Sequence, residues 1–311
     1  MLEIYRSNSE NHLELLDDIV DGCWVNCIDP TTDEIERLTY HRIPLDFITD
    51  PLDVDERPRT EREDDGTVLI ILRIPYFEGA LVDVPYSTIS LGIVITEHFV
   101  VTICRRKNEL IERLKQTKMR GFSTSKRVRF LLHILLSSAN KYLNYLHEID
   151  NTVDRLEDKL QISLNNKDLL ELLKYQKSLV YFATALRTNE LMMERLQRSQ
   201  IFLTYPDDED LLEDVITEIK QAREMVSISS DILKSMTDSF ASIISNNLND
   251  VVKVLTSVTI ILSIPTIVTS FFGMNFSLPF EQFDFAYWIV IGISIGLAAV
   301  TTILFVWRKW F

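Results

Sequence analysis

The sequence has few cysteines and few glycines, and each shortage excludes a class of protein. Only Cys23, Cys27 and Cys104 occur among 311 residues. An odd number without a CxxC pair argues against a disulfide framework or a zinc ribbon, so we expect reduced, buried thiols. The 8 glycines form no phosphate-binding loop and no nucleophile elbow, and no metalloprotease motif is present. We therefore expect neither an enzyme nor a prosthetic group.

Positive charge is also scarce. The chain has 32 Lys and Arg against 46 Asp and Glu, a net charge of −14. No basic patch with interleaved aromatic residues offsets this charge, which excludes nucleic acid as a partner. The acidic surface suits cations or basic partners, and a merely well-hydrated surface is the alternative. The N-terminal "MLEIYRSNSENHLELLDD" lacks the basic residues and apolar core of a signal peptide, so we expect a cytoplasmic N-terminus.

Apolar and β-branched clusters characterise the first hundred residues. They are "CWVNCID" (23–29), "TVLIILRIPYF" (67–77), "STISLGIVIT" (87–96) and "FVVTICR" (99–105). These clusters predict strands, with Glu97-His98 as a tight hairpin between the last two. Helical stretches are expected over 31–41, capped by Thr32 or Asp33, and over 43–64. We expect residues 1–122 to form a cytoplasmic α/β domain.

Helical periodicity replaces the strand pattern after residue 122. Apolar residues recur at spacings of three and four from 123 for some forty residues, with Ser123 to Ser125 available as caps. A second such segment covers 167–200, so 123–205 is predicted to contain long antiparallel cytoplasmic helices. A third segment, 206–272, has no glycine and only Pro265 inside it. As one stalk helix it would be on the order of 100 Å long, too long for the interior of a globule.

Two uncharged runs near the C-terminus are long enough to cross a bilayer. They cover 254–272, at the end of the long helix, and 287–307. About 20 apolar residues in a helix span the hydrocarbon core, so we expect two transmembrane helices. Aromatic residues at the ends of the second run are typical interface anchors. They are Tyr287, Trp288, Trp307 and Trp310.

The charges around these runs predict their orientation. Lys253 precedes the first run, and Arg308 and Lys309 in the tail 308–311 follow the second. The loop 273–286 contains the acids Glu281 and Asp284 but no basic residue. Since basic residues favour the cytoplasmic side, we expect both termini inside and this loop outside.

Hydroxyl side chains recur along the first transmembrane run at spacings of 3, 4, 3 and 4. They are Thr256, Thr259, Ser263, Thr266 and Ser270, and we call them the seam. This 3.5-residue period is typical of a left-handed bundle, in which the seam would face a common axis. The alternative is that each hydroxyl bonds the carbonyl four residues back, as we expect of the off-seam Ser257 and Thr269.

One polar seam cannot enclose water, so a pore would need several copies of the chain. An uncharged, hydroxyl-lined path could pass a hydrated cation without retaining it. Asn275 would then place a ring of amide oxygens at the outer mouth, where they could bind the water shell of an ion. Mg²⁺ dehydrates reluctantly and fits such a ring.

The tripeptide Gly273-Met274-Asn275, followed by a short loop and one last apolar helix, resembles the CorA family of divalent-cation transporters. The acidic front half and the long approach helix extend this resemblance over the whole chain. It implies a funnel-shaped homopentamer in the cell membrane (plasma or inner), with the first transmembrane helices around a pore and the second ones outside. It also implies a selectivity filter formed by Gly273, Met274 and Asn275.

The resemblance assigns further pore positions. "NDVVKVLT" resembles the family's cytoplasmic pore entrance, which implies a polar ring at Asn249 and apolar constrictions at Val252 and Leu255. A ring of leucines can gate by excluding water. Packing against the second transmembrane helix is the alternative for Leu255. Thr266 corresponds to the family's hydroxyl ring within the membrane.

The resemblance also implies a cytoplasmic sensor of Mg²⁺, built from acids at subunit boundaries. "FITDPLDVDERPR" places one carboxylate at Asp50, and "LLEDVITE" places another at Asp214. Two such carboxylates repel until a divalent ion binds between them, so internal Mg²⁺ would hold the pore shut. Ordinary surface charges are the alternative in so acidic a chain.

Three positions depart from the family pattern. Phe272 replaces the usual Tyr before Gly273, Thr49 replaces an acid often found beside Asp50, and Glu281 is displaced by one place. These changes leave the number of sensor ions, and the roles of Glu281 and Asp284, open.

The sequence is thus interpreted as a pentameric Mg²⁺ channel, with Co²⁺ and Ni²⁺ as further candidate ions. Mg²⁺ is both the transported and the regulatory ion, and the partners are other copies of the chain, the lipid bilayer and divalent cations. One alternative is a relative that carries another metal such as Zn²⁺, or that exports. Zinc-handling relatives often replace the Met of the tripeptide, so Met274 favours magnesium. A second alternative is a non-transporting, membrane-anchored coiled-coil scaffold.

Overall fold

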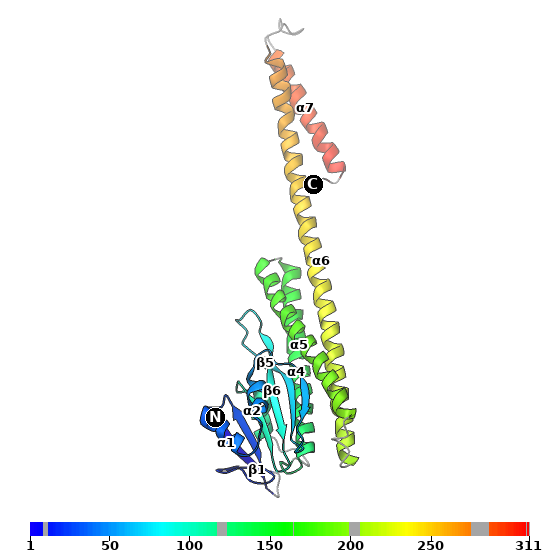
Figure 1. Ribbon diagram of the computed structural model, residues 1–311. Coiled ribbons are helices and arrows are strands. Elements are labelled where there is room, and N and C mark those ends of the chain that lie inside the picture. Colours follow the sequence, from blue (N-terminus) through cyan, green and yellow to red (C-terminus); the bar gives the residue numbers. More distant parts are fainter. Residues whose placement is uncertain are drawn as a thin grey trace. The chain divides into compact units, whose positions relative to one another are not determined.

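The computed structural model describes residues 1–8, 12–116, 123–163, 165–198, 206–274, 286–308 and 310. The chain forms two compact units, Met1–Ser235 and Met236–Phe311. The first unit contains a mixed sheet with helices (Figure 1), which confirms the predicted α/β fold class. Its strands are β1 (Leu2–Ser7), β2 (Leu13–Leu16), β3 (Trp24–Ile28), β4 (Arg59–Arg62), β5 (Val68–Phe77), β6 (Tyr86–Ile95) and β7 (Val100–Cys104). The helices of the chain are α1 (Thr32–Tyr40), α2 (Leu45–Thr49), the 3₁₀ helix η1 (Asp50–Leu52), α3 (Glu109–Gln116), α4 (Arg127–Ile162), α5 (Asn166–Arg198), α6 (Pro206–Phe272) and α7 (Ala286–Trp307).

The sheet has the strand order β2-β1-β3-β7-β6-β5-β4, and only β3 and β7 are parallel neighbours. The four strands predicted from the sequence correspond to β3, β5, β6 and β7. The predicted hairpin at Glu97-His98 joins β6 to β7, where Ile95 pairs with Val100. Strands β1, β2 and β4 were not predicted.

The sheet is covered by helices on both faces. Val68, Ile70 and Leu72 of β5 belong to a core with residues of α3, α4, α5 and the N-terminal part of α6. The alternate residues Leu69 and Ile71 belong to a second core with residues of α1 and α2. Since successive side chains of a strand point to opposite faces, a strand that is covered on both sides is apolar throughout. Cys23, Cys27 and Cys104 are buried and unpaired, and burial raises the pKa of the Cys27 thiol to about 12.

Two helix predictions in the first hundred residues need correction. The stretch 43–64 is helical only in α2 and η1, because Pro51 limits the helix and residues 59–62 pair with β5 instead. Helix α1 is capped by Thr31, not by Thr32 or Asp33. The Thr31 side chain accepts from the Glu34 backbone N–H, and the Glu34 carboxylate accepts from the Thr31 N–H, which is a capping box.

The long helices follow the predicted periodicity, but the predicted cap of α4 is wrong. Its N-cap is Lys126, without a side-chain hydrogen bond. Thr124 instead ties the start of α4 to the sheet, because its Oγ1 donates to Gly22 O at 2.6 Å and accepts from Ser7 N at 3.1 Å. Helix α6 is continuous from Pro206 to Phe272 with Pro265 inside it.

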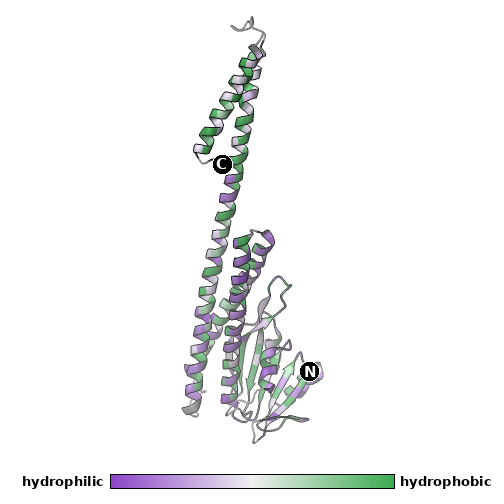
Figure 2. Ribbon diagram, turned by 180° about the vertical axis from the view of Figure 1, so that it is seen from behind, coloured by the Kyte–Doolittle hydropathy of each residue, from purple (hydrophilic) through white to green (hydrophobic). Residues whose placement is uncertain are grey.

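The second unit contains the C-terminal part of α6 and the whole of α7. Two helices are long and apolar enough to cross a membrane, one ending at Phe272 and the other covering Tyr287–Trp307. Figure 2 shows the hydrophobic residues that dominate α7 and the turns of α6 beside it. Tyr287, Trp288 and Trp307 are exposed at the ends of α7, as membrane-interface anchors are.

Candidate functional site

The seam lies on one exposed face of α6. All five of its residues, Thr256, Thr259, Ser263, Thr266 and Ser270, are exposed in the chain. Helical geometry brings them together, because alternating steps of three and four residues return to nearly the same side of a helix. The structure therefore brings the predicted hydroxyls together along α6.

The opposite side of α6 is the covered one. Helix α7 lies beside this part of α6 (Figures 1 and 2). The less exposed positions of α6 here are Ser257, Ile261, Ile264, Pro265, Val268 and Phe272, and Ser257 is completely buried. Ile261 is two residues from Thr259 and thus about 200° around the helix from it. The hydroxyl seam consequently faces away from α7 within this unit.

Three of the five seam hydroxyls donate to the backbone carbonyl four residues back, which is the alternative that the sequence left open for the seam. Thr259 donates to Leu255 O at 2.8 Å, Ser263 to Thr259 O at 2.7 Å and Thr266 to Leu262 O at 3.3 Å. The expected bonds of off-seam Ser257 and Thr269 are also present. A hydroxyl that has used its proton in this way presents only acceptor lone pairs to its surroundings. Such a surface accepts hydrogen bonds from water.

The tripeptide Gly273-Met274-Asn275, which was predicted to form the filter, follows directly on the end of α6. Gly273 N–H still donates to Thr269 O at 2.9 Å, and Met274 N–H approaches Phe271 O at 3.4 Å. A Cβ on Gly273 would lie 3.1 Å from Thr269 O, so glycine permits the tight last turn. Met274 is exposed. Asn275, Glu281 and Asp284 lie outside the described residues.

The predicted pore entrance is also uncovered in the single chain. Val252 is 51% exposed and Leu255 is 65% exposed, and Asn249 is exposed as well. Leu255 is thus not buried against α7, which was its alternative role. Large apolar side chains on an uncovered helix face indicate that a partner surface or lipid covers them.

Asp50, the first residue predicted to belong to a sensor, is held by a close contact between η1 and the sheet. Pro51 lies so near Gly92 of β6 that a Cβ at position 92 would be 2.2 Å from Pro51 Cγ. Only glycine allows this approach, and it fixes the height of η1 above β6. The hydroxyl of neighbouring Thr49 donates to Leu45 O at 3.1 Å.

Asp50 is not an unpaired carboxylate. Its Oδ2 accepts from Arg59 Nη2 at 2.6 Å. Arg59 also pairs with Glu61 through Nε at 2.5 Å and with Glu56 through Nη1. Burial alone would lower the pKa of Arg59, but the hydrogen bond to Glu61 and the charges of all three carboxylates raise it overall.

Asp214, the second residue predicted to belong to a sensor, is exposed on α6 and forms no ion pair within the described part of the chain. The single chain does not join it to Asp50. Among the described residues, no group of three or more His, Cys, Asp or Glu side chains is arranged to hold a metal ion. A site that uses both acids would therefore require more than one copy of the chain.

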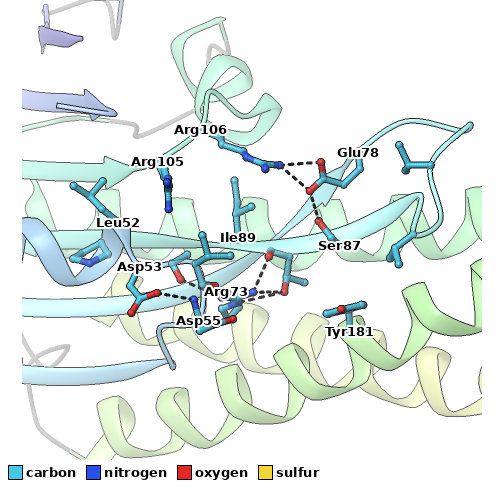
Figure 3. Close-up of a pocket in the computed structure, with 16 residues that line it drawn as sticks. Leu52, Asp53, Asp55, Arg73, Glu78, Ser87, Ile89, Arg105, Arg106 and Tyr181 are labelled. Carbon is cyan, nitrogen blue, oxygen red and sulfur yellow. Dashed lines mark hydrogen bonds and ion pairs between the residues drawn. The ribbon is translucent and has the colours of Figure 1, made fainter. Parts of the chain in front are cut away.

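A pocket of about 420 Å³ borders the segment that follows Asp50 (Figure 3). Arg73 on β5 lies at its base and donates from Nη1 to Val54 O at 2.5 Å and from Nη2 to Thr88 O at 2.7 Å. The Asp53 carboxylate accepts from Asp55 N at 3.0 Å and closes a turn in this segment. These bonds fix the backbone between η1 and β4.

A family model described as CorA-like Mg²⁺ transporter protein matches residues 21–309. The chain belongs to this family. It is 30% identical over 293 residues to the cobalt/magnesium transport protein CorA of Methanocaldococcus jannaschii, covering 92% of this chain and 90% of that protein. The complete structure of the CorA magnesium transporter from that organism matches with a TM-score of 0.87 and 27% identity, over 100% of this chain and 99% of that one. The corresponding protein of Thermotoga maritima is 23% identical over 92% of this chain and 83% of its own length.

Membership of the CorA-like family decides the broad class. The chain is a membrane transporter with two C-terminal membrane-spanning helices, and it is not an enzyme, as the sequence predicted.

The sequence did not predict three residues that pair with Asp50 or hold the backbone around it. They are Arg59, Arg73 and Gly92. Residues 53–65 contain arginines between acidic residues, but the sequence does not indicate which acid pairs with which arginine. For Gly92, a glycine in the middle of an apolar strand was the available signal, because it often marks a close backbone approach.

Proposed function

We propose that the chain forms a homopentameric channel for Mg²⁺, with the seam of α6 lining a central pore. Residues 1–205 form the cytoplasmic part, 206–272 the stalk and pore helix, 273–286 the outer loop and 308–311 the cytoplasmic tail. Co²⁺ is a second candidate ion, since two relatives are named as cobalt/magnesium transport proteins. The assay below tests whether the chain carries Ni²⁺ or Zn²⁺ instead. It also tests whether transport is export instead of import.

The polarity of the seam is the observation that carries this proposal. In a hydrated cation the water oxygens point to the ion and the hydrogens point outward. A wall that passes the hydrated ion must therefore accept hydrogen bonds. Thr259, Ser263 and Thr266 have given their protons to the backbone and present acceptors on the face away from α7.

The filter is proposed at Gly273, Met274 and Asn275, where amide oxygens of several copies would bind the water shell of Mg²⁺. The apolar residues Val252 and Leu255 would form the gate, which closes by excluding water. A coiled-coil scaffold gives no role to a seam of acceptors, so the channel is favoured over that alternative.

Metal uptake by liposomes that contain the purified full chain tests the pore. We expect Mg²⁺ flux in the wild type, and loss of at least about 90% of it in Asn275→Ala, because this change removes the amide oxygens that would accept hydrogen bonds from the water shell of the ion. Flux that survives this change would exclude the proposed filter. The same assay with Co²⁺, Ni²⁺ and Zn²⁺ ranks the ions, and reversal of the gradient tests export.

Closure is proposed to depend on Asp50 and on Asp214 of another copy. Mg²⁺ bound between them would hold neighbouring subunits together, and loss of the ion would release them. Asp50→Asn and Asp214→Asn should each keep the channel open at internal Mg²⁺ concentrations that close the wild type. If inhibition by internal Mg²⁺ is unchanged in both variants, the sensor is elsewhere.

A further inference from the structure

Three carboxylates from three parts of the fold converge on the guanidinium of Arg59. Nη2 donates to Asp50 of η1 at 2.6 Å, and Nε donates to Glu61 of β4 at 2.5 Å. Nη1 donates to Glu56, which lies in the segment between η1 and β4. One positive charge thus neutralises part of a cluster of three negative charges.

This cluster is partly shielded from solvent. The side chains of Arg59, Asp50 and Glu56 are 29%, 32% and 20% exposed. The neighbouring Arg62 is exposed and forms no ion pair with any described residue. Arg59 is therefore distinguished from the other arginines of this segment by its three partners.

Arg59 occupies the place beside Asp50 that a cation would take. Asp50 Oδ2 already accepts a charge-assisted hydrogen bond, while Oδ1 has no hydrogen-bond partner among the described residues. A small divalent cation gains most from a carboxylate whose full negative charge is available, and the guanidinium of Arg59 already neutralises part of the charge of Asp50. Mg²⁺ and Arg59 must compete for this carboxylate.

We propose that Arg59 is a built-in competitor that sets the internal Mg²⁺ concentration at which the channel closes. This inference rests on the proposed sensor role of Asp50. When Mg²⁺ binds Asp50, Arg59 keeps Glu56 and Glu61 as partners, so its charge is not left unpaired. When Mg²⁺ leaves, the guanidinium returns to Asp50 and reduces the repulsion between acids of adjoining subunits.

The backbone around Asp50 is fixed, so Arg59 and Mg²⁺ can replace each other at Asp50 by side-chain movement alone. Contact of Pro51 with Gly92 holds η1, and Arg73 binds the carbonyl oxygens of Val54 and Glu56 from below. Asp50 therefore keeps its place whether or not Arg59 is bound to it. Arg59 changes the affinity of the site and leaves its position unchanged.

The test measures Mg²⁺ uptake against internal Mg²⁺ for the full chain in liposomes, with Mg²⁺ as the only divalent ion. Arg59→Gln should lower the half-inhibitory Mg²⁺ concentration about twofold to fivefold, the range expected for losing one partly exposed ion pair. Arg59→Lys keeps the charge and should stay near the wild type. Arg62→Gln removes the same charge from the same strand and should have no effect.

Two results would overturn the inference. An unchanged half-inhibitory concentration in Arg59→Gln means that Arg59 does not compete, and a raised one means that Arg59 instead orients Asp50 for the metal. If Arg59→Gln does not assemble, the charge-balanced variant Arg59→Gln with Glu61→Gln is used. Its half-inhibitory Mg²⁺ concentration should also be lower than that of the wild type.

Asp50→Asn separates this inference from the function on which it rests. If Asp50→Asn leaves inhibition by Mg²⁺ intact, the sensor role of Asp50 is wrong regardless of Arg59. If Asp50→Asn relieves inhibition while Arg59→Gln changes nothing, the sensor stands and the competitor is rejected. A Mg²⁺-dependent rise in the unfolding temperature of the same variants gives a second readout that does not depend on transport.

Discussion

The carboxylate of Asp208, in the first turns of α6, accepts a hydrogen bond from Arg129 Nε of α4 at 2.6 Å. Both side chains are largely buried, with 3% of Asp208 and 14% of Arg129 exposed. The long helix is thus attached to the core of the first unit by an ion pair near its N-terminus. Leu212, Val215 and Ile219 continue this attachment along the next turns of α6 as members of the core.

Loss of one partner of this pair should destabilise the cytoplasmic unit strongly. Arg129→Met leaves the Asp208 charge buried, and we expect the free energy of unfolding to fall by about 3 to 5 kcal/mol. Replacing both partners, Arg129→Met with Asp208→Leu, should recover much of the loss. Chemical denaturation of the full chain in detergent measures both. Lys177→Met, which breaks an exposed pair with Asp83, is the control and should change stability by about 1 kcal/mol or less.

One turn beyond Arg129, His133 gives the unit a predicted pH dependence. Burial lowers the pKa of His133, and the charge of Arg129 lowers it further, while Asp208 acts in the opposite direction. In the unfolded chain the imidazole binds a proton near pH 6.5, but in the folded chain it does so only at lower pH. The free energy of unfolding should therefore be flat above about pH 7 and should fall as pH decreases below 6.5.

His133→Gln is expected to reduce that decrease. One titrating group can change the free energy of unfolding by at most about 1.4 kcal/mol per pH unit. Between pH 6.5 and 5.5 the wild type should therefore lose at most this much more stability than His133→Gln. Denaturation at pH 7.5, 6.5 and 5.5 provides the comparison. Parallel curves for wild type and variant would mean that other groups cause the acid sensitivity.

Much of the fold could be predicted from the sequence because the patterns that specify it lie within short segments. The strand β5 is apolar on both faces, and the seam of α6 repeats every 3.5 residues, so neither depends on distant residues. Strand β4 is the opposite case. Its sequence, Arg59 to Arg62, contains no apolar residue, and it becomes a strand only because β5 pairs with it. The pairing of residues distant in sequence decided that element.

The candidate site divides in the same way. The seam, the pore entrance and the filter were predicted from spacing and resemblance within one short stretch of the chain, in α6 and directly after it. The surroundings of Asp50 were not, because they depend on Gly92 and Arg73, which come from β6 and β5. Asp208 shows the same limit. Its buried partner Arg129 lies on α4, 79 residues earlier in the chain.

Gly92→Ala should disturb the sensor more than a methyl group ordinarily would. The added Cβ would lie 2.2 Å from Pro51 Cγ and 2.6 Å from Pro51 Cβ, so η1 must move away from β6. Overpacking of this kind lowers the free energy of unfolding by about 1 to 3 kcal/mol. Because Asp50 begins η1, inhibition of uptake by internal Mg²⁺ should weaken as well. In a Pro51→Gly background the added methyl group has room, so Gly92→Ala should lower the free energy of unfolding by less than it does in the wild type. If the effects of the two substitutions on the free energy of unfolding simply add, the contact between Pro51 and Gly92 is contradicted.

A matched pair of serines in α6 tests whether the seam faces the ion path. Ser263 and Ser257 each donate to the carbonyl four residues back at 2.7 Å, so Ser→Ala removes the same bond at both positions. Ser263 is exposed on the seam, whereas Ser257 is fully buried on the covered face. Ser263→Ala also removes an acceptor for the water shell of the ion, and losing one hydrogen bond of about 1 kcal/mol should reduce Mg²⁺ flux about fivefold. Ser257→Ala should leave flux unchanged. Liposome uptake at low internal Mg²⁺, where the gate is open, measures both, and equal effects of the two substitutions would mean that the seam does not line the pore.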